Sequence, residues 1–178
     1  FGICGCMIDP EGDPIGINVV EDCASMGWDY IELSLRDVAA LSEKDFASLR
    51  RRLDGSGLRC EACNNFYPPE QRITGPAVDL SGLTAYTRRA LGRARDLGAE
   101  FVVFGSSGAR NIPEGFPRDR GAVRFLEATC MIGDLAAGLG ITAAIEYHNK
   151  GEANVLTSMG EAVRLCDEAA APSVRVLT

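Results

Sequence analysis

A cluster of polar side chains follows an apolar run toward the C-terminal end of the sequence. Glu146 comes directly after Ile141-Thr-Ala-Ala-Ile145, and His148 and Glu152 follow it closely. A carboxylate at the end of a buried strand is unfavourable unless it is paired or bound to a metal ion. Carboxylate and imidazole groups are also common ligands of divalent metal ions. The pattern therefore predicts a site for a metal ion and a substrate around Glu146.

The roles of Glu146 and His148 have alternatives. Glu146 could cap the next helix from an exposed loop, although Ser158 already stands at the capping position. His148 is the single histidine of the chain, and no serine or cysteine nucleophile motif accompanies it. This is poor evidence for a nucleophile triad, and on the loop beside Glu146 the histidine indicates a substrate contact, with a core residue as the alternative.

Two further acids lie within apolar runs. Glu32 belongs to Tyr30-Ile-Glu-Leu33, and Glu61 belongs to Arg59-Cys-Glu-Ala-Cys63. Each carboxylate could face the interior of the fold, where it would either contact substrate or be paired with another group. Pairing is favoured for Glu61, whereas both roles stay open for Glu32, which is counted among the candidate substrate contacts.

Two polar loops add further candidate contacts. Asn64 and Asn65 precede Phe66-Tyr-Pro68, a combination that suits hydroxyl recognition and packing against a sugar, and that also suits a turn rich in Asn and Pro. Gly105-Ser-Ser-Gly-Ala-Arg110 could hold an anion through its backbone amides, with Arg110 as a substrate contact. A tight turn explains the glycines of this segment equally well.

These residues follow short β-type runs that alternate with segments of helical periodicity. The expected strands are Phe1–Cys6, Tyr30–Leu33, Leu58–Cys63, Phe101–Phe104, Thr142–Ile145 and Val174–Leu177. Capping boxes at Ser42 and Ser158 predict helix starts, and an apolar stripe from Leu80 to Leu97 predicts another helix. A further stripe predicts a buried helix face made of Val123, Leu126, Cys130, Gly133 and Ala137. This alternation indicates a parallel α/β fold.

The connections between these elements are unequal. Links from helix to strand are short and contain glycine, whereas links from strand to helix are long and polar, as in 64–79, 105–118 and 147–157. Parallel α/β proteins place their functional sites on the loops that follow the strands. No G-x-G-x-x-G motif follows the first strand, which favours a (β/α) barrel over an open nucleotide-binding sheet.

Composition restricts the function classes. Of the 178 residues, 46% are hydrophobic, and no apolar run approaches the ~20 residues of a membrane helix, so we expect no membrane span and no signal peptide. The net charge of −7 weighs against binding to nucleic acid. The seven cysteines indicate a reducing, cytoplasmic compartment. Cys60 and Cys63 have C-x-x-C spacing, but strand alternation is expected to put their thiols on opposite faces.

Four motifs give the chain a resemblance to a known family. They are Gly27-Trp-Asp-Tyr-Ile-Glu-Leu33, Glu61-Ala-Cys-Asn-Asn-Phe66, Val103-Phe-Gly-Ser-Ser-Gly-Ala-Arg110 and Ala144-Ile-Glu-Tyr-His-Asn-Lys-Gly-Glu152. In this order they resemble the sugar phosphate isomerase/epimerase family of the xylose isomerase-like TIM barrel superfamily. The resemblance implies an α/β fold of the (β/α)8 TIM barrel class, with residues 1–178 as one domain that stops after the start of strand six. Members usually carry Pro-Leu-Asn where this chain has Tyr147-His148-Asn149.

The resemblance also implies a divalent metal cofactor, Mn²⁺, Co²⁺, Mg²⁺ or Zn²⁺, held by Glu, Asp, His and Glu. Glu146 matches the first ligand and the catalytic acid–base, and Glu152 matches a carboxylate that contacts substrate in ketose 3-epimerases. The remaining ligands have no match here, and we expect the Asp just beyond Thr178. In the family mechanism a metal-bound carboxylate removes the proton α to a carbonyl, the cation stabilises the enediolate, and a second carboxylate returns a proton.

We therefore expect a metal-dependent isomerase or epimerase whose partner is a small-molecule sugar, with a homo-oligomer as a possible assembly. An inosose-type dehydratase of the same fold shares the enolate chemistry and is the close alternative. An endonuclease acting at abasic DNA is disfavoured by the single histidine and the sequence pI of about 4.8. A non-catalytic barrel fragment or binding module is the remaining alternative.

Overall fold

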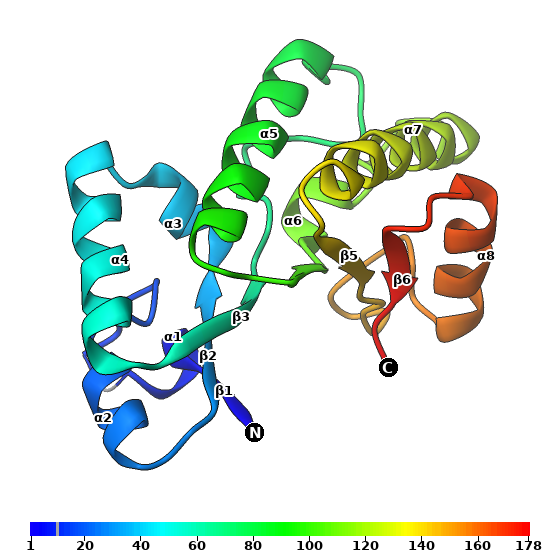
Figure 1. Cartoon of the computed structure of the whole chain (residues 1–178). Helices are drawn as coiled ribbons and strands as arrows, with labels where there is room; N and C mark the ends of the chain where they lie inside the picture. The colour runs from blue at the N-terminus through cyan, green and yellow to red at the C-terminus, as the bar shows by residue number, and fades with distance from the viewer. Residues whose placement is uncertain (10) are drawn as a thin grey trace.

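Within residues 1–9 and 11–178, which the computed structural model describes, six parallel strands form one sheet in chain order (Figure 1). Each strand pairs with the next one along the sequence. The strands are β1 (Gly2–Cys4), β2 (Tyr30–Ser34), β3 (Arg59–Asn64), β4 (Phe101–Phe104), β5 (Thr142–Ile145) and β6 (Val174–Val176). Sequential parallel order of this kind is the order of a (β/α) barrel.

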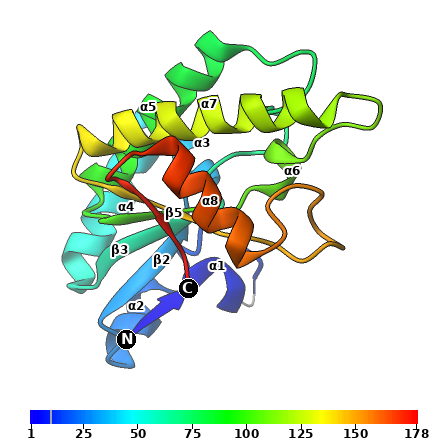
Figure 2. The ribbon, with the colours of Figure 1, turned by 90° about the vertical axis from the view of Figure 1, so that its right-hand side faces the viewer.

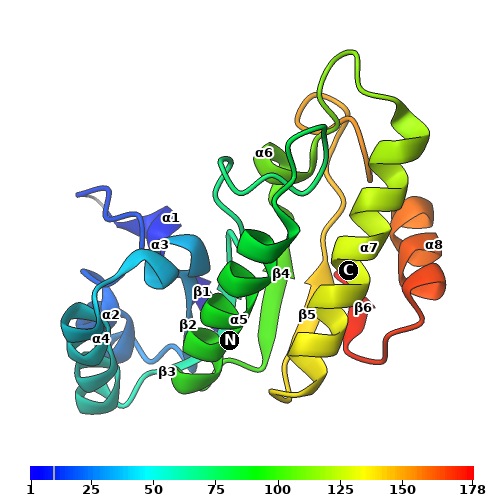
Figure 3. The ribbon, with the colours of Figure 1, turned by 90° about the horizontal axis from the view of Figure 1, so that it is seen from above.

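Helices connect the strands. They are α1 (Gly5–Ile8), α2 (Val20–Ser25), α3 (Leu35–Ala40), α4 (Glu43–Ser56), α5 (Leu80–Asp96), α6 (Ser107–Arg110), α7 (Arg118–Ala137) and α8 (Met159–Ala169). Figures 1 and 2 show α5 and α7 on the same side of the strands. Seen from above in Figure 3, α4, α5, α7 and α8 follow one another from the β1 edge of the sheet toward the β6 edge. No helix in the described ranges is long and apolar enough to cross a membrane.

The predicted helix caps at Ser42 and Ser158 are both confirmed. The Ser42 side chain accepts a hydrogen bond from the backbone N–H of Asp45 at the start of α4. The Ser158 side chain accepts one from the backbone N–H of Glu161 at the start of α8. Each bond satisfies a backbone donor that lacks a partner within its helix. Ser158 therefore caps α8, and Glu146 is free of that role.

The first strand is shorter than predicted. It ends at Cys4, and α1 starts at Gly5, whereas the sequence pattern extended the strand to Cys6. At this point the backbone of Gly16 lies against that of Gly5 and Cys6, since a Cβ on Gly16 would be 2.5 Å from the nitrogen of Cys6 and 2.6 Å from the carbonyl carbon of Gly5. Gly16 also has a φ of 90°, which favours glycine. This contact turns the chain away from the strand direction.

The buried face of α7 also differs from the predicted stripe. The buried residues of the helix are Gly121, Phe125, Ala128, Thr129, Ile132, Gly133 and Ala136. Val123, which the pattern placed inside, is 56% exposed. Apolar residues cover more than one face of this helix, so periodicity alone could not choose between them. The choice follows Phe125, which packs on Phe104 of β4 with ring centroids 5.6 Å apart.

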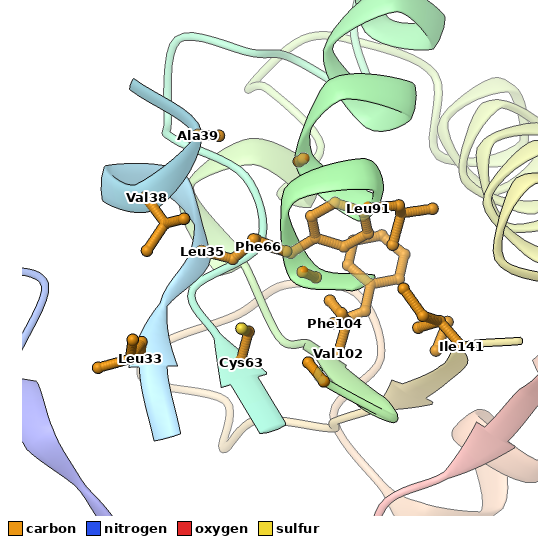
Figure 4. Packing of buried hydrophobic residues seen from close by; sticks show 14 of the residues in the cluster. Leu33, Leu35, Val38, Ala39, Cys63, Phe66, Leu91, Val102, Phe104 and Ile141 are labelled. Carbon is orange, nitrogen blue, oxygen red and sulfur yellow. The ribbon is translucent and has the colours of Figure 1, made fainter. Parts of the chain in front are cut away.

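The core between sheet and helices is centred on aromatic rings. Phe66 and Tyr67 stack with ring centroids 4.2 Å apart, and the Phe104 ring meets Tyr67 at 5.5 Å. Figure 4 shows Phe66 and Phe104 beside Leu91 of α5. The Tyr67 hydroxyl is hydrogen-bonded to Thr87 of the same helix at 2.7 Å, so this buried ring keeps its polar group satisfied.

The prediction that Cys60 and Cys63 face opposite sides of the sheet is wrong. Their sulfur atoms lie 4.0 Å apart, and both side chains are buried. The β2–β3 pairing shifts register between Tyr30 and Glu32, which leaves an additional residue on β3. Such a bulge reverses the alternation of side chains, so residues three apart come to the same face.

Replacing Phe104 tests the assignment of the core. Phe104→Ala is expected to lower the free energy of unfolding by about 3–5 kcal/mol, because it removes a fully buried ring and leaves a cavity. Phe101→Ala is the matched control on the same strand. Since that ring is 45% exposed, its loss should cost about 1 kcal/mol or less. Urea unfolding followed by circular dichroism measures both, and equal losses would contradict this assignment.

Candidate active site at the C-terminal ends of the strands

Polar side chains of β1, β2 and β3 meet on the face of the sheet that is opposite the helices. Ile31 and Leu33 are fully buried, so strand alternation turns Glu32 to the other face. Glu32 is in register with Cys4. Asn64, the last residue of β3, donates a hydrogen bond to the Cys4 sulfur at 3.0 Å. The structure thus brings two of the predicted substrate contacts, Glu32 and Asn64, together on this face.

Glu146 stands at the end of β5 within electrostatic range of this group. Burial raises the pKa of the Glu32 carboxyl above its ordinary value, a hydrogen bond from Asn64 lowers it, and the negative charge of Glu146 raises it further. This effect means that the two carboxyl groups lie within range of electrostatic interaction. The predicted site residues of β2, β3 and β5 therefore share one region.

An imidazole ring lies between two carboxylates. His148 Nε2 is 3.1 Å from Glu146 Oε2, which makes a hydrogen bond. His148 Nδ1 is 3.6 Å from Glu152 Oε2, which is too far for a direct hydrogen bond. The His148 side chain is 16% exposed, against 61% for that of Glu152. Glu152 is therefore the member of the trio that is most open to a ligand.

Gly105 leaves the space that this arrangement needs. A Cβ atom at position 105 would lie 2.2 Å from Glu146 Oε2 and 2.7 Å from His148 Nε2. Both distances are shorter than any non-bonded contact, so a side chain there would displace the carboxylate and the ring. The sequence pattern indicated a turn or an anion-binding loop at this glycine, whereas in the structure it accommodates Glu146.

The loop after β5 is held by a pair of asparagines, Asn111 and Asn154, which were not among the predicted site residues. Asn154 Oδ1 accepts a hydrogen bond from the backbone N–H of Ile112 at 2.9 Å, and Asn154 Nδ2 donates to the Ile112 carbonyl at 2.8 Å. Asn111 Oδ1 accepts from the backbone N–H of Asn154 at 3.0 Å. These bonds tie the loops after β4 and β5 together. Two asparagines far apart in the sequence carried no signal of this pairing.

Asn65 and Arg110 occupy different settings from the other candidates. Asn65 is exposed and has a φ of 46°, and its carbonyl accepts a hydrogen bond from the backbone N–H of Arg36 at 3.0 Å. Arg110 is fully buried and donates from Nη1 to the carbonyl of Glu146 at 2.7 Å. The guanidinium is therefore not presented to a ligand at the surface, contrary to the expectation of a direct substrate contact. Glu61 forms the predicted ion pair, with Arg59.

The resemblance implies a divalent metal ion, and the described residues only partly fit one. In the ranges 1–9 and 11–178, no three side chains of His, Cys, Asp or Glu are placed to hold a metal ion together. Glu146 offers a carboxylate, but its Oε2 is already hydrogen-bonded to His148. The described part of the chain thus contributes one carboxylate rather than a complete ligand set.

Sequential parallel strands, helices on one face and polar side chains at the strand ends define an α/β barrel protein of the TIM type. The sequence profile of the xylose isomerase-like TIM barrel family matches residues 20–178, and the chain belongs to that family. The predicted fold class is thereby confirmed.

Solved structures of sugar epimerases share this fold. D-psicose 3-epimerase from Clostridium cellulolyticum H10, crystallised with D-tagatose, superposes with a TM-score of 0.83 at 18% identity, covering 98% of this chain and 61% of that chain. L-ribulose 3-epimerase gives 0.79 at 18% identity, covering 99% and 59%. An AP endonuclease of family 2 from Brucella melitensis gives 0.76 at 19% identity, covering 99% and 66%.

At these identities the structural similarity establishes the fold alone. The chain spans about 61% of the length of the psicose epimerases that it matches. No curated protein matches the chain in sequence.

Gly105→Ala tests the space beside Glu146. The variant should fold, because the displaced atoms are the ends of flexible side chains, but the Glu146–His148 hydrogen bond should be lost. The imidazole ¹⁵N resonances of His148, the single histidine, report that bond directly. Gly92→Ala in α5 is the control, since a Cβ there meets nothing within 4 Å. Unchanged His148 resonances in Gly105→Ala would contradict the geometry.

Glu32→Gln tests the half-buried carboxylate. The folded-state pKa of Glu32 is raised, so the stability that it contributes is present below its unfolded-state pKa and is lost as pH rises through the folded-state value. Glu32→Gln should therefore be more stable than the wild type at pH 7, with the difference disappearing in acid. Urea unfolding at both pH values measures this. Glu61→Gln, which loses an ion pair with Arg59, should show no such gain.

Proposed function

We propose that the protein is a divalent-metal-dependent isomerase or epimerase that acts on a sugar or sugar derivative through an enediolate. The observation that carries the proposal is the Glu146–His148–Glu152 trio at the end of β5, whose Glu146 charge acts on the Glu32 carboxyl of β2. The matched structures support a ketose substrate, because they include a psicose 3-epimerase crystallised with D-tagatose and an L-ribulose 3-epimerase.

Epimerisation next to a carbonyl requires a base that removes a weakly acidic C–H proton and an acid that returns one. Glu146 is the proposed base, since His148 orients its carboxylate and Gly105 leaves room for it. Glu152 is the more exposed carboxylate, and we assign it to the substrate hydroxyls together with His148. Enclosure of the substrate between these groups and Glu32 would position its α-carbon.

Hydroxyl recognition on the opposite side is assigned to Asn64 and Asn65. Asn64 already donates to the Cys4 sulfur, a weak acceptor that a sugar oxygen can replace. Asn65 is exposed at the same strand end. The divalent ion, Mn²⁺, Co²⁺, Mg²⁺ or Zn²⁺, would take Glu146 as a ligand, and the described residues supply it with this one carboxylate.

The endonuclease named among the matched structures fits this chain less well. A net charge of −7 repels a phosphate backbone. The single histidine also leaves few nitrogen ligands for a cluster of metal ions.

Substitution of the proposed base tests the function. With D-fructose, D-psicose, D-tagatose and L-ribulose as substrates, Glu146→Gln should lower kcat by at least about 100-fold, because a carboxamide cannot accept the proton. Exchange of the substrate α-proton with D₂O, followed by NMR, measures the step itself. Glu168→Gln on the exposed side of α8 is the control and should leave kcat unchanged. Full turnover in Glu146→Gln would refute this role, and loss of water from the substrate would indicate a dehydratase.

Metal content provides a separate test of the cofactor. The purified protein should contain a divalent ion by elemental analysis, and a chelator should abolish proton exchange, with recovery on adding Mn²⁺ or Co²⁺. Turnover that is unaffected by a chelator, in protein without bound metal, would remove the metal from the proposal.

A further inference from the structure

Arg110 is the most deeply buried charged side chain in the described part of the chain, with no exposed surface. Its Nη1 donates to two backbone carbonyls, those of Glu146 at 2.7 Å and Phe104 at 3.3 Å. Its Nε and Nη2 have no hydrogen-bond partner among the described residues. Burying a cation without a paired carboxylate is strongly unfavourable, so its retention calls for a reason.

A second buried arginine provides a comparison. Arg93 is 5% exposed, yet its guanidinium donates to the carbonyls of Val38 and Leu41, each at 2.7 Å, and to the Glu43 carboxylate at 2.7 Å. Its role in joining α5 to the end of α3 is fully explained by those bonds. Arg110 has no such carboxylate partner. The two carbonyls that it binds, those of Phe104 and Glu146, lie at the same point of the sheet.

That place is the end of the β4–β5 ladder. The last paired residues are Phe104 and Ile145, and the Phe104 carbonyl also accepts a hydrogen bond from the backbone N–H of Glu146 at 3.3 Å. Arg110 Nη1 binds the carbonyls on both sides of this last bond. The side chain thus prolongs the pairing of the two strands by one residue, and that residue is Glu146.

The position of Arg110 is itself fixed by its surroundings. Its backbone N–H donates to the Ser106 carbonyl at 3.1 Å, and its carbonyl accepts from the Thr74 hydroxyl at 3.0 Å. The guanidinium lies over the Phe125 ring, 6.0 Å from its centroid. Burial lowers the pKa of Arg110 to about 10 and the charge of Glu146 opposes that shift, so the side chain stays charged at neutral pH.

We propose that Arg110 is a positioning residue, which fixes the backbone of Glu146 so that its carboxylate meets His148 and the substrate. The expected effect on kcat rests on the proposed function, whereas the effect on the Glu146–His148 hydrogen bond can be measured without it. When a catalytic base is displaced from its productive position, the reaction slows even though the substrate still binds. Loss of Arg110 should therefore lower kcat more than it raises KM.

The experiment compares Arg110→Met and Arg110→Lys with Arg93→Met in the intact protein, prepared without a histidine tag. The first readout is the ¹⁵N signal of His148 Nε2 at constant pH, which reports its hydrogen bond to Glu146. Arg110→Met should shift this signal and lower kcat at least about tenfold, with KM within about threefold of the wild type. Arg110→Lys has one ammonium for the two carbonyls and should give a smaller shift and a smaller loss.

Arg93→Met controls for loss of a buried arginine as such. It should lower the melting temperature and leave the His148 signal unchanged. A folded Arg110→Met with wild-type His148 signal and kcat would overturn the proposal. If Arg110→Met does not fold, a wild-type His148 signal in Arg110→Lys overturns the proposal that Arg110 positions Glu146 by binding the carbonyls of Phe104 and Glu146. A wild type that turns over no ketose would refute the proposed function, and the His148 signal would still decide the role of Arg110.

Discussion

The pairing of β4 with β5 determines where the groups of the candidate site lie. The two strands are in continuous register from Phe101 and Thr142 to Phe104 and Ile145. Phe104 and Ile145 are buried on the helix side, so the next residue, Glu146, turns to the opposite face. A slip of one residue would direct this carboxylate into the aromatic core. The β4–β5 register thus determines both which residues form the aromatic core and which residue points toward the candidate site.

Hydrogen bonds within and between the loops after β4 and β5 then fix the side chains around Glu146 relative to one another. Asn111 and Asn154 join the loops after β4 and β5 through side chain to backbone bonds. The backbone N–H of His148 donates to the Leu156 carbonyl at 3.1 Å, which folds the second loop back on itself. Loops tied in this way present side chains with little freedom. His148 can therefore hold the Glu146 carboxylate while Glu152 stays open to solvent.

Glycine and arginine have complementary roles beside Glu146. Gly105 has no side chain, so the Glu146 carboxylate can occupy the space beside it. Arg110 holds the backbone of Glu146 through a hydrogen bond to its carbonyl. Both residues lie in the segment after β4, which the sequence pattern presented as an anion-binding loop or a turn. Their contacts are with Glu146 and its neighbours, so this segment supports the residue at the end of the next strand.

Much of the fold was predictable from sequence because the signals are local. Residues 101–104 and 142–145 are short apolar runs between polar loops, and their strand bounds were predicted correctly. The capping serines were also predictable, since a cap depends on residues within one turn of the helix. Where the signal was not local the prediction failed. The end of β1 depends on Gly16, and the buried face of α7 depends on Phe104.

The sequence by itself determined the order of strands and helices, and it predicted a candidate site at the strand ends with Glu146 as its central acid. These follow from periodicity and loop length, which are properties of consecutive residues. Only the tertiary structure decided that His148 binds Glu146, that Arg110 is buried under the strand ends, and that Cys60 and Cys63 share a face. Each of these depends on how separate segments pack, and the β2–β3 bulge shows how one additional residue reverses a local rule.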